Sequence, residues 1–363
     1  MTRRFELSDG RSAKFWQVDV RGEVLHVEWG ALGSAARTQT KRFADERKAA
    51  AALDTLIREK VRKGYAEVDL SAAPTPRPLA DYALETLVPR GTHGGLVLGF
   101  GVRGKEVLAV GGQGSDLVLA SKTGRRFTRK KSPGNGLRAA LVRDGELFVA
   151  GEYGYVARST DGGRSWQRLA FPSSWKKGSP CLFGVVEDEA GAVWTAGDGG
   201  FVAKVSGARL VPQLSLGEDL GRMRATPRGL LIPSDGGHVF EVRDGEARRL
   251  AFDAKVMLMA VAVTKLGTVV AVGQAGALWR LPVGAKKAQK VKAPPTLLTG
   301  IDVLADGQVV VTALDGSLLA SIDDGAHFER IDGPGVPLWC CRAHGEGALL
   351  GGQGGLVLRW APR

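Results

Sequence analysis

A unit of about 40 residues recurs from about residue 83 to the C-terminus, and it constrains the fold more than any other feature. A small residue precedes the same turn in each unit, at intervals of 39, 46, 36, 40, 40 and 38 residues. These anchors are Gly112, Gly151, Gly197, Pro233, Gly273, Ala313 and Gly351. Most units read as an apolar strand, a Gly or Asp-Gly turn, an apolar strand, a Gly-x-x-Gly turn, a third strand and a polar fourth strand, as in residues 137–171. Each unit therefore predicts four short strands.

Seven such units of four strands are typical of a seven-bladed β-propeller. The last unit stops at Trp360–Arg363 and lacks a fourth strand, whereas the segment Ala83–Val88 resembles the fourth strand Trp166–Phe171 of an earlier unit. We expect this N-terminal segment to complete the seventh blade, because closure removes an open sheet edge.

The first 70 residues follow another pattern. Strands are predicted at Arg3–Leu7, Lys14–Val20 and Val24–Trp29, and a helix is predicted from Asp45, its N-cap, to Gly64. The segment Ser71–Pro78 has three prolines, which favour an extended spacer. The expected organisation is mainly β: a small α+β domain with an antiparallel sheet and one helix (1–70), a Pro-rich linker (71–80) and the propeller (81–363).

The charge favours anionic partners, because the formal net charge is +12. The N-terminus has no apolar signal region and no apolar run approaches the length of a membrane span, so a cytoplasmic protein, associated with the nucleoid if it binds DNA, is expected. Cys181, Cys340 and Cys341 form no metal-binding spacing and are predicted to be packed thiols. We expect no metal and no cofactor.

Trp29 closes an alternating strand and is followed by small, polar and basic residues. Two interpretations stay open: the indole packs in the core, or it is displayed to an anionic partner. For the second interpretation the candidate nucleic-acid-binding residues are Trp29, Gly30, Lys14, Arg37, Lys41 and Arg42. Stacking on an aromatic ring contributes about 1–3 kcal/mol per base.

The N-terminal region resembles a WGR domain, as found in poly(ADP-ribose) polymerases and in scattered bacterial proteins. The resemblance covers nearly all of residues 1–70 and rests on Lys14-Phe15-Trp16, Trp29-Gly30, Gly33, Lys41-Arg42-Phe43, the Ala-rich helix, Lys60 and Gly64-Tyr65. It implies binding to nucleic-acid ends or breaks, with the motif Trp stacked on a terminal sugar. Ala31 stands where the motif has its arginine, so one guanidinium is missing.

The ring resembles the Asp-box (BNR repeat) propellers of sialidases and of the Ycf48-like photosystem assembly factors, and the second group more closely. Ser159–Trp166 matches the S-x-D-x-G-x-S/T-W pattern, Ser321–Phe328 is a second copy, and Ser121–Phe127 is a degenerate third. In this motif the Asp binds turn amides and Gly permits a positive φ. The resemblance implies the fold, not the role.

Two basic segments occupy connections between blades and form a candidate propeller surface: Arg129, Lys130 and Lys131 in one, and Trp175, Lys176 and Lys177 in the other. Trp175 is interpreted either as part of a recognition surface or as a lid on its own blade. We expect no enzyme, because the glycine-rich turns lie between strands and the histidines form no catalytic spacing. The leading hypothesis is a DNA end- or nick-binding protein with a propeller platform for an unknown protein partner; the alternative is a protein-interaction scaffold without a nucleic-acid role.

Overall fold

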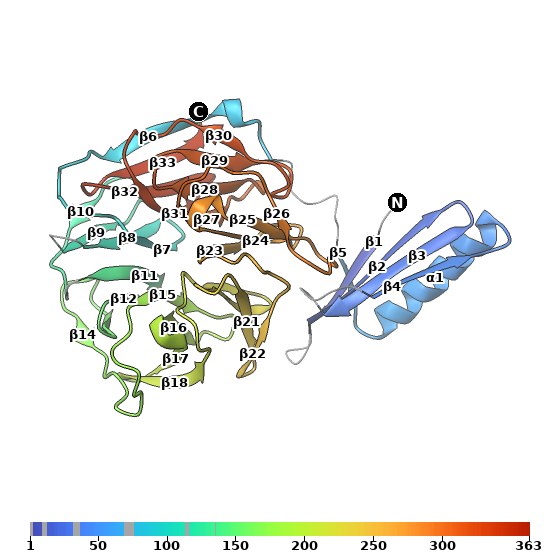
Figure 1. The fold of residues 1–363 in the computed structure, drawn as a ribbon, viewed down its shortest axis with the longest axis horizontal. Coiled ribbons are helices and arrows are strands. Elements are labelled where there is room, and N and C mark those ends of the chain that lie inside the picture. Colours follow the sequence, from blue (N-terminus) through green and yellow to red (C-terminus); the bar gives the residue numbers. More distant parts are fainter. Residues whose placement is uncertain (1–2, 9–12, 32–36, 69–75, 113–115, 135) are drawn as a thin grey trace.

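The computed structural model describes residues 3–8, 13–31, 37–68, 76–112, 116–134 and 136–363 (Figure 1). Within them the chain forms a small N-terminal domain and a ring of sheets. Gly33 and the part of the predicted linker at 71–75 lie outside the described residues.

The N-terminal domain is a five-stranded antiparallel sheet with strand order β4-β3-β2-β1-β5. Its strands are β1 (Arg3–Ser8), β2 (Ala13–Arg21), β3 (Val24–Ala31), β4 (Arg37–Arg42) and β5 (Ala66–Val68). The three predicted strands are confirmed within two residues. The edge strands β4 and β5 were not predicted, because β4 is exposed along its whole length and has no apolar alternation, and β5 has three residues.

One helix, α1 (Glu46–Arg62), covers one face of this sheet. The Asp45 side chain accepts a hydrogen bond from the backbone N–H of Lys48 at 2.7 Å, which confirms the predicted N-cap. At the other end Gly64 adopts φ +87°, and the N–H groups of Gly64 and Tyr65 donate to the carbonyls of Val61 and Lys60. This is the Schellman pattern that ends a helix at a left-handed glycine.

Seven four-stranded antiparallel sheets follow and confirm the seven predicted blades. The first blade contains β7 (Gly99–Arg103), β8 (Glu106–Gly111), β9 (Leu117–Ser121) and β10 (Thr128–Arg129), and the second contains β11 (Leu137–Arg143), β12 (Glu146–Gly151), β13 (Val156–Ser159) and β14 (Gln167–Arg168). The third contains β15 (Leu182–Glu187), β16 (Val193–Gly197), β17 (Phe201–Ser206) and β18 (Arg209–Ser215). The fourth contains β19 (Arg224–Thr226), β20 (Gly229–Pro233), β21 (Val239–Arg243) and β22 (Glu246–Arg249).

Blades five to seven contain β23 (Leu258–Val263), β24 (Val269–Gly273), β25 (Leu278–Leu281) and β26 (Gln289–Lys290); β27 (Leu298–Val303), β28 (Val309–Ala313), β29 (Leu318–Ser321) and β30 (Glu329–Ile331); and β31 (Leu338–His344), β32 (Gly347–Gly352), β33 (Val357–Pro362) and β6 (Tyr82–Val88). Short 3₁₀ turns are η2 (Leu79–Asp81), η3 (Asp198–Gly200) and η4 (Gln274–Gly276). The second strands β16, β24 and β28 are buried throughout, because each blade packs against neighbours on both faces.

Strand β6 closes the ring, as predicted from the missing fourth strand of the last unit. It pairs antiparallel with β33, so the two ends of the propeller share one sheet (Figure 1). The buried ring of Tyr82 lies 4.4 Å from that of Trp360, and the Tyr82 hydroxyl donates to Asp306 at 2.7 Å. Asp306 also accepts from the N–H of Arg77, and Leu79 packs against the hydrophobic cluster that contains Tyr82 and Trp360. Residues 77–79, assigned to the linker from sequence, are therefore bound to the ring.

The hairpin between β13 and β14 is held by one carboxylate. Asp161 accepts hydrogen bonds from the backbone N–H groups of Arg164 and Ser165, both at 2.9 Å, and from the Ser165 hydroxyl at 2.6 Å. The Ser159 hydroxyl donates to Asp161 and accepts from the N–H of Gly163. Because Ser165, Ser159 and Arg164 all donate to this carboxylate, its pKa is held well below its usual range. Asp323 forms the corresponding turn between β29 and β30.

Candidate nucleic-acid interface

A row of four cross-strand partners crosses the N-terminal sheet from its centre to the edge strand β4. Phe5 pairs with Trp16, Trp16 with Trp29, and Trp29 with Arg37, so all four side chains lie on one face. The cluster that contains Phe5, Trp16 and Ile57 of α1 identifies this as the helix-covered face.

Exposure rises along this row. Phe5 and Trp16 are 1% and 2% exposed, Trp29 is half-buried, and Arg37 is exposed. Trp29 packs against the hydrophobic core beneath α1, yet it keeps accessible surface because its outer neighbour is the fully exposed strand β4. Trp29 is therefore both a packing group and a partly accessible residue on the helix side of the sheet.

The residues predicted to contact phosphates do not all lie on the same face of the N-terminal sheet. By strand register, Lys14, Arg37 and Lys41 share the face of Trp29, and all three are exposed. Arg42 lies on the opposite face, with its Nε atom 3.7 Å from the Glu23 carboxylate. Lys41 is four residues from Arg37, about 13 Å along the strand, with its Nζ atom 5.1 Å from the centre of the Phe43 ring. Gly30 pairs with Phe15 on the face away from the helix.

A further cation, Lys60, was absent from the residues predicted to bind nucleic acid. Its Nζ atom lies 5.5 Å from the Trp16 ring and 5.2 Å from the Tyr65 ring, at the C-terminal end of α1. Burial and the nearby Lys63 lower the pKa of Lys60. The sequence carried a signal for it, because Lys60 occupies a position on the otherwise apolar stripe of the helix.

The two basic segments of the propeller are partly engaged by their own surroundings. Arg129 donates to the backbone carbonyls of His93 and Asp116 at 3.4 and 3.3 Å. Lys130 is half-buried and Lys131 is exposed. Arg129 ends β10, and Lys130 and Lys131 begin the connection from β10 to β11. The second segment lies in the next connection between blades, from β14 to β15.

Trp175 forms a lid on the third blade. Its ring meets the buried Phe201 edge-on with 4.8 Å between the ring centres, and it belongs to the hydrophobic cluster around Phe201. Lys177 places its Nζ atom 5.5 Å from the Trp175 ring and donates to Ser215 at 2.9 Å. Lys176 donates to the carbonyl of Ser173. These contacts favour the lid interpretation of Trp175, while both lysines remain exposed.

The three cysteines are free thiols, and Cys340 and Cys341 are buried. Burial raises the pKa of Cys340 to about 12 and that of Cys181 to about 11. Among the described residues no group of three or more His, Cys, Asp or Glu side chains could hold a metal ion. No helix in this part of the chain is long and apolar enough to cross a membrane.

The propeller resembles solved structures of several functions. Virginiamycin B lyase from Staphylococcus aureus superposes with a TM-score of 0.66 at 11% identity, over 78% of this chain and all of that one. YCF48 from Cyanidioschyzon merolae gives 0.62 at 16% identity, over 77% and 98%. A structure of YCF48 bound to D1 peptide gives 0.64 at 15%, over 80% and 100%. At these identities the likeness shows the fold alone, and because one neighbour is a lyase the fold does not exclude catalysis.

The N-terminal domain has relatives in sequence. Protein YehF of Escherichia coli K12 is 45% identical over 65 residues, which are 18% of this chain and 24% of the relative. The uncharacterized protein YfeS of the same organism is 40% identical over 67 residues, 18% and 28% respectively. The chain thus spans about a quarter of the length of these relatives. Residues 1–71 match the WGR domain family. The chain therefore combines an N-terminal WGR domain with a seven-bladed β-propeller.

Proposed function

We propose that this protein binds DNA ends or nicks through its WGR domain and uses the propeller as a platform for a protein partner. The proposal places it in the cytoplasm, in association with the nucleoid. The observation that carries it is the helix-side row in which half-buried Trp29 stands between the core and exposed Arg37. A partly exposed indole beside guanidinium and ammonium groups suits a sugar or base next to phosphates.

Four cations on this side of the domain are candidate phosphate contacts: Lys14, Arg37 and Lys41 by strand register, and Lys60 by its contact with Trp16. Lys14 pairs directly with position 31, where the motif arginine is replaced by alanine. The lysine therefore keeps one positive charge beside the site that lost one. A lysine binds phosphate as a point charge, whereas an arginine can form two parallel hydrogen bonds to it. The replacement therefore favours less specific recognition of DNA ends.

Strand β4 offers a matched pair of variants. Arg37 and Arg42 are both exposed arginines of the same edge strand, but they face opposite sides of the sheet. Arg37→Gln and Arg42→Gln remove the same charge and the same number of donors. Binding of the full chain to nicked, blunt and single-stranded DNA is measured by fluorescence anisotropy at several salt concentrations.

The expected slope of log affinity against log salt is about −3.6 on duplex DNA if all four cations contact phosphates. Arg37→Gln should reduce the slope to about −2.7 and weaken binding, whereas Arg42→Gln should leave both unchanged. Equal losses from the two variants would mean that binding depends on net charge and not on this face.

The second candidate function is a protein-interaction scaffold, which the alanine at position 31 favours. On that hypothesis the WGR domain contacts a protein and the basic residues have no phosphate partner. Absence of measurable binding to all three DNA forms at low salt would decide for the scaffold.

A further inference from the structure

A cavity of about 290 Å³ lies at the centre of the ring, among the first strands of the blades. Much of its wall consists of glycine and alanine, which leave the interior open to long side chains. These small lining residues include Gly99, Gly101, Ala139, Gly184, Ala260 and Gly300.

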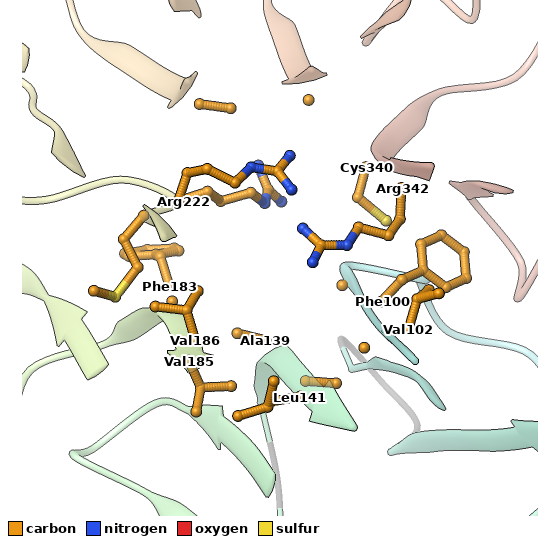
Figure 2. Close-up of a pocket in the computed structure, with 18 of the residues that line it drawn as sticks. Phe100, Val102, Ala139, Leu141, Phe183, Val185, Val186, Arg222, Cys340 and Arg342 are labelled. Atoms are coloured by element: carbon orange, nitrogen blue, oxygen red, sulfur yellow. The ribbon is translucent and has the colours of Figure 1, made fainter. Parts of the chain in front are cut away.

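Three arginines fill part of this space. Arg222 and Arg224 come from the fourth blade and Arg342 comes from β31 of the seventh, and Figure 2 shows Arg222 and Arg342 extending toward each other across the cavity. Arg224 and Arg342 keep 19% and 34% of their side-chain surface accessible, and both line the cavity. Because both side chains line the cavity, part of their accessible surface faces its interior.

The charges of this group do not balance. The carboxylate of Asp302 lies 3.0 Å from Arg224 and 3.9 Å from Arg342, and it serves both. Arg222 donates instead to the uncharged backbone carbonyls of Thr299 and Leu98. Three positive charges and one negative charge leave a net charge of two. The like charge of Arg224 and burial lower the pKa of Arg342 to about 10.

The other charged residues of the cavity wall are already paired. Arg103 lies 2.5 Å from Asp144, and Arg138 pairs with Glu152. Glu187 pairs with Arg103 and with Arg143, which are 3.4 and 3.3 Å away. The excess positive charge is therefore confined to Arg222, Arg224 and Arg342.

We propose that this central cavity binds a doubly charged phosphoryl group, either free phosphate or the phosphate of a small ester. A dianion would offset the two excess charges, and guanidinium groups on opposite walls present paired N–H donors to tetrahedral oxygens. A phosphate ion fills only a fraction of the 290 Å³, so the cavity also has room for the organic part of an ester. This site is separate from the WGR domain and does not depend on its proposed function.

The test uses the full chain with inorganic phosphate and with ribose 5-phosphate, and sodium chloride at matched ionic strength serves as the reference. We expect both phosphates to raise the melting temperature of the propeller above the chloride value and to bind in calorimetry. Tighter binding of the ester identifies a phosphorylated small molecule as the occupant, and equal or weaker binding identifies free phosphate. Absence of any shift beyond chloride overturns the proposal.

Arg342→Met locates the site, and Arg330→Met is its control. Arg330 is an exposed arginine of the outer strand β30, 3.3 Å from Asp315, so both variants remove one positive charge. Because Arg342 is repelled by Arg224, its replacement should not lower the melting temperature in chloride, yet it should weaken phosphate binding at least tenfold. Arg330→Met should bind as the original chain does.

Two results would contradict this assignment. Undiminished phosphate binding by Arg342→Met would place the phosphate elsewhere, including on the WGR domain. If Arg342→Met fails to fold, Arg342→Lys keeps the charge but loses the planar fork. Phosphate binding by Arg342→Lys as tight as in the original chain would then overturn the proposed role of the guanidinium.

Discussion

Tyr82→Phe tests whether the contacts of the ring-closing strand β6 contribute to the free energy of unfolding of the propeller. The hydroxyl of Tyr82 donates to the Asp306 carboxylate at 2.7 Å, and the rest of the side chain is buried against Trp360. The substitution keeps the ring and removes only the donor. A hydrogen bond to a charged group contributes about 1.5–3 kcal/mol, so the propeller should lose about this amount of its free energy of unfolding.

Tyr155→Phe is the matched control. Its hydroxyl donates to the uncharged backbone carbonyl of Pro133 at 2.6 Å, and the side chain is half-buried in the second blade. A neutral hydrogen bond contributes about 0.5–1.5 kcal/mol, so the control should cost less. Urea unfolding of the full chain, followed by far-ultraviolet circular dichroism, gives both values. A cost for Tyr82→Phe no larger than that for Tyr155→Phe would refute the reasoning.

The contribution of Tyr82 to the free energy of unfolding should depend on pH. Burial and the hydrogen bond to Asp306 raise the pKa of Tyr82 above its ordinary value. Because the folded-state pKa is the higher one, the stabilising contribution is complete below about pH 10 and is lost as the pH rises toward the folded-state pKa. The difference in unfolding free energy between the original chain and Tyr82→Phe should therefore shrink above about pH 10, by at most about 1.4 kcal/mol per pH unit. A constant difference up to about pH 11.5 would contradict the raised pKa of Tyr82.

Three further predictions concern Trp29, Asp161 and the two buried cysteines. Trp29→Phe should retain the fold, measured by circular dichroism, and weaken binding to nicked DNA less than Trp29→Leu does, because phenylalanine still offers a ring for stacking. Asp161→Ala should lower the melting temperature of the propeller, because four backbone and side-chain donors lose their acceptor. Since the pKa of Asp161 is lowered in the fold, its contribution should fade as the pH falls below about 4. Cys340 and Cys341 should react with a thiol reagent only in denaturant, because burial raises both pKa values.

The ring could be predicted from sequence because its signals are local. Each blade marks its turns with glycine or aspartate, and Ala83–Val88 repeats the polarity of a fourth strand, so the closure with β33 follows from one missing element. The excess charge of the central cavity could not be predicted in the same way. Arg222 comes from the fourth blade and Arg342 from the seventh. The two side chains extend toward each other only because the first strands of other blades place small residues around the central axis.

The small sheet shows the limit of pattern reasoning at a single residue. Alternation placed Val27 and Trp29 on one face, but it did not say which face the helix covers. It also gave no sign of β4, so the neighbour that leaves Trp29 partly exposed was missing from the prediction. The sequence of β4 has no apolar residues and therefore no hydrophobic periodicity that would predict a strand. The register of β4 nevertheless decides which of its cations lie on the same face as Trp29.

This placement changes what a Trp29 variant can prove. The indole packs on the same core as Trp16 and Ile57, so truncating it removes buried apolar area as well as partly accessible surface. Lost DNA binding by such a variant would fit either a missing contact or a loosened sheet. An Arg37 variant can be interpreted more directly, because Arg37 lies outside the core on the exposed edge strand. Arg42 on the same strand has the same side chain but faces the opposite side of the sheet, so it serves as the control. The comparison of these two arginines is therefore the decisive test of a nucleic-acid interface on the helix side of the domain.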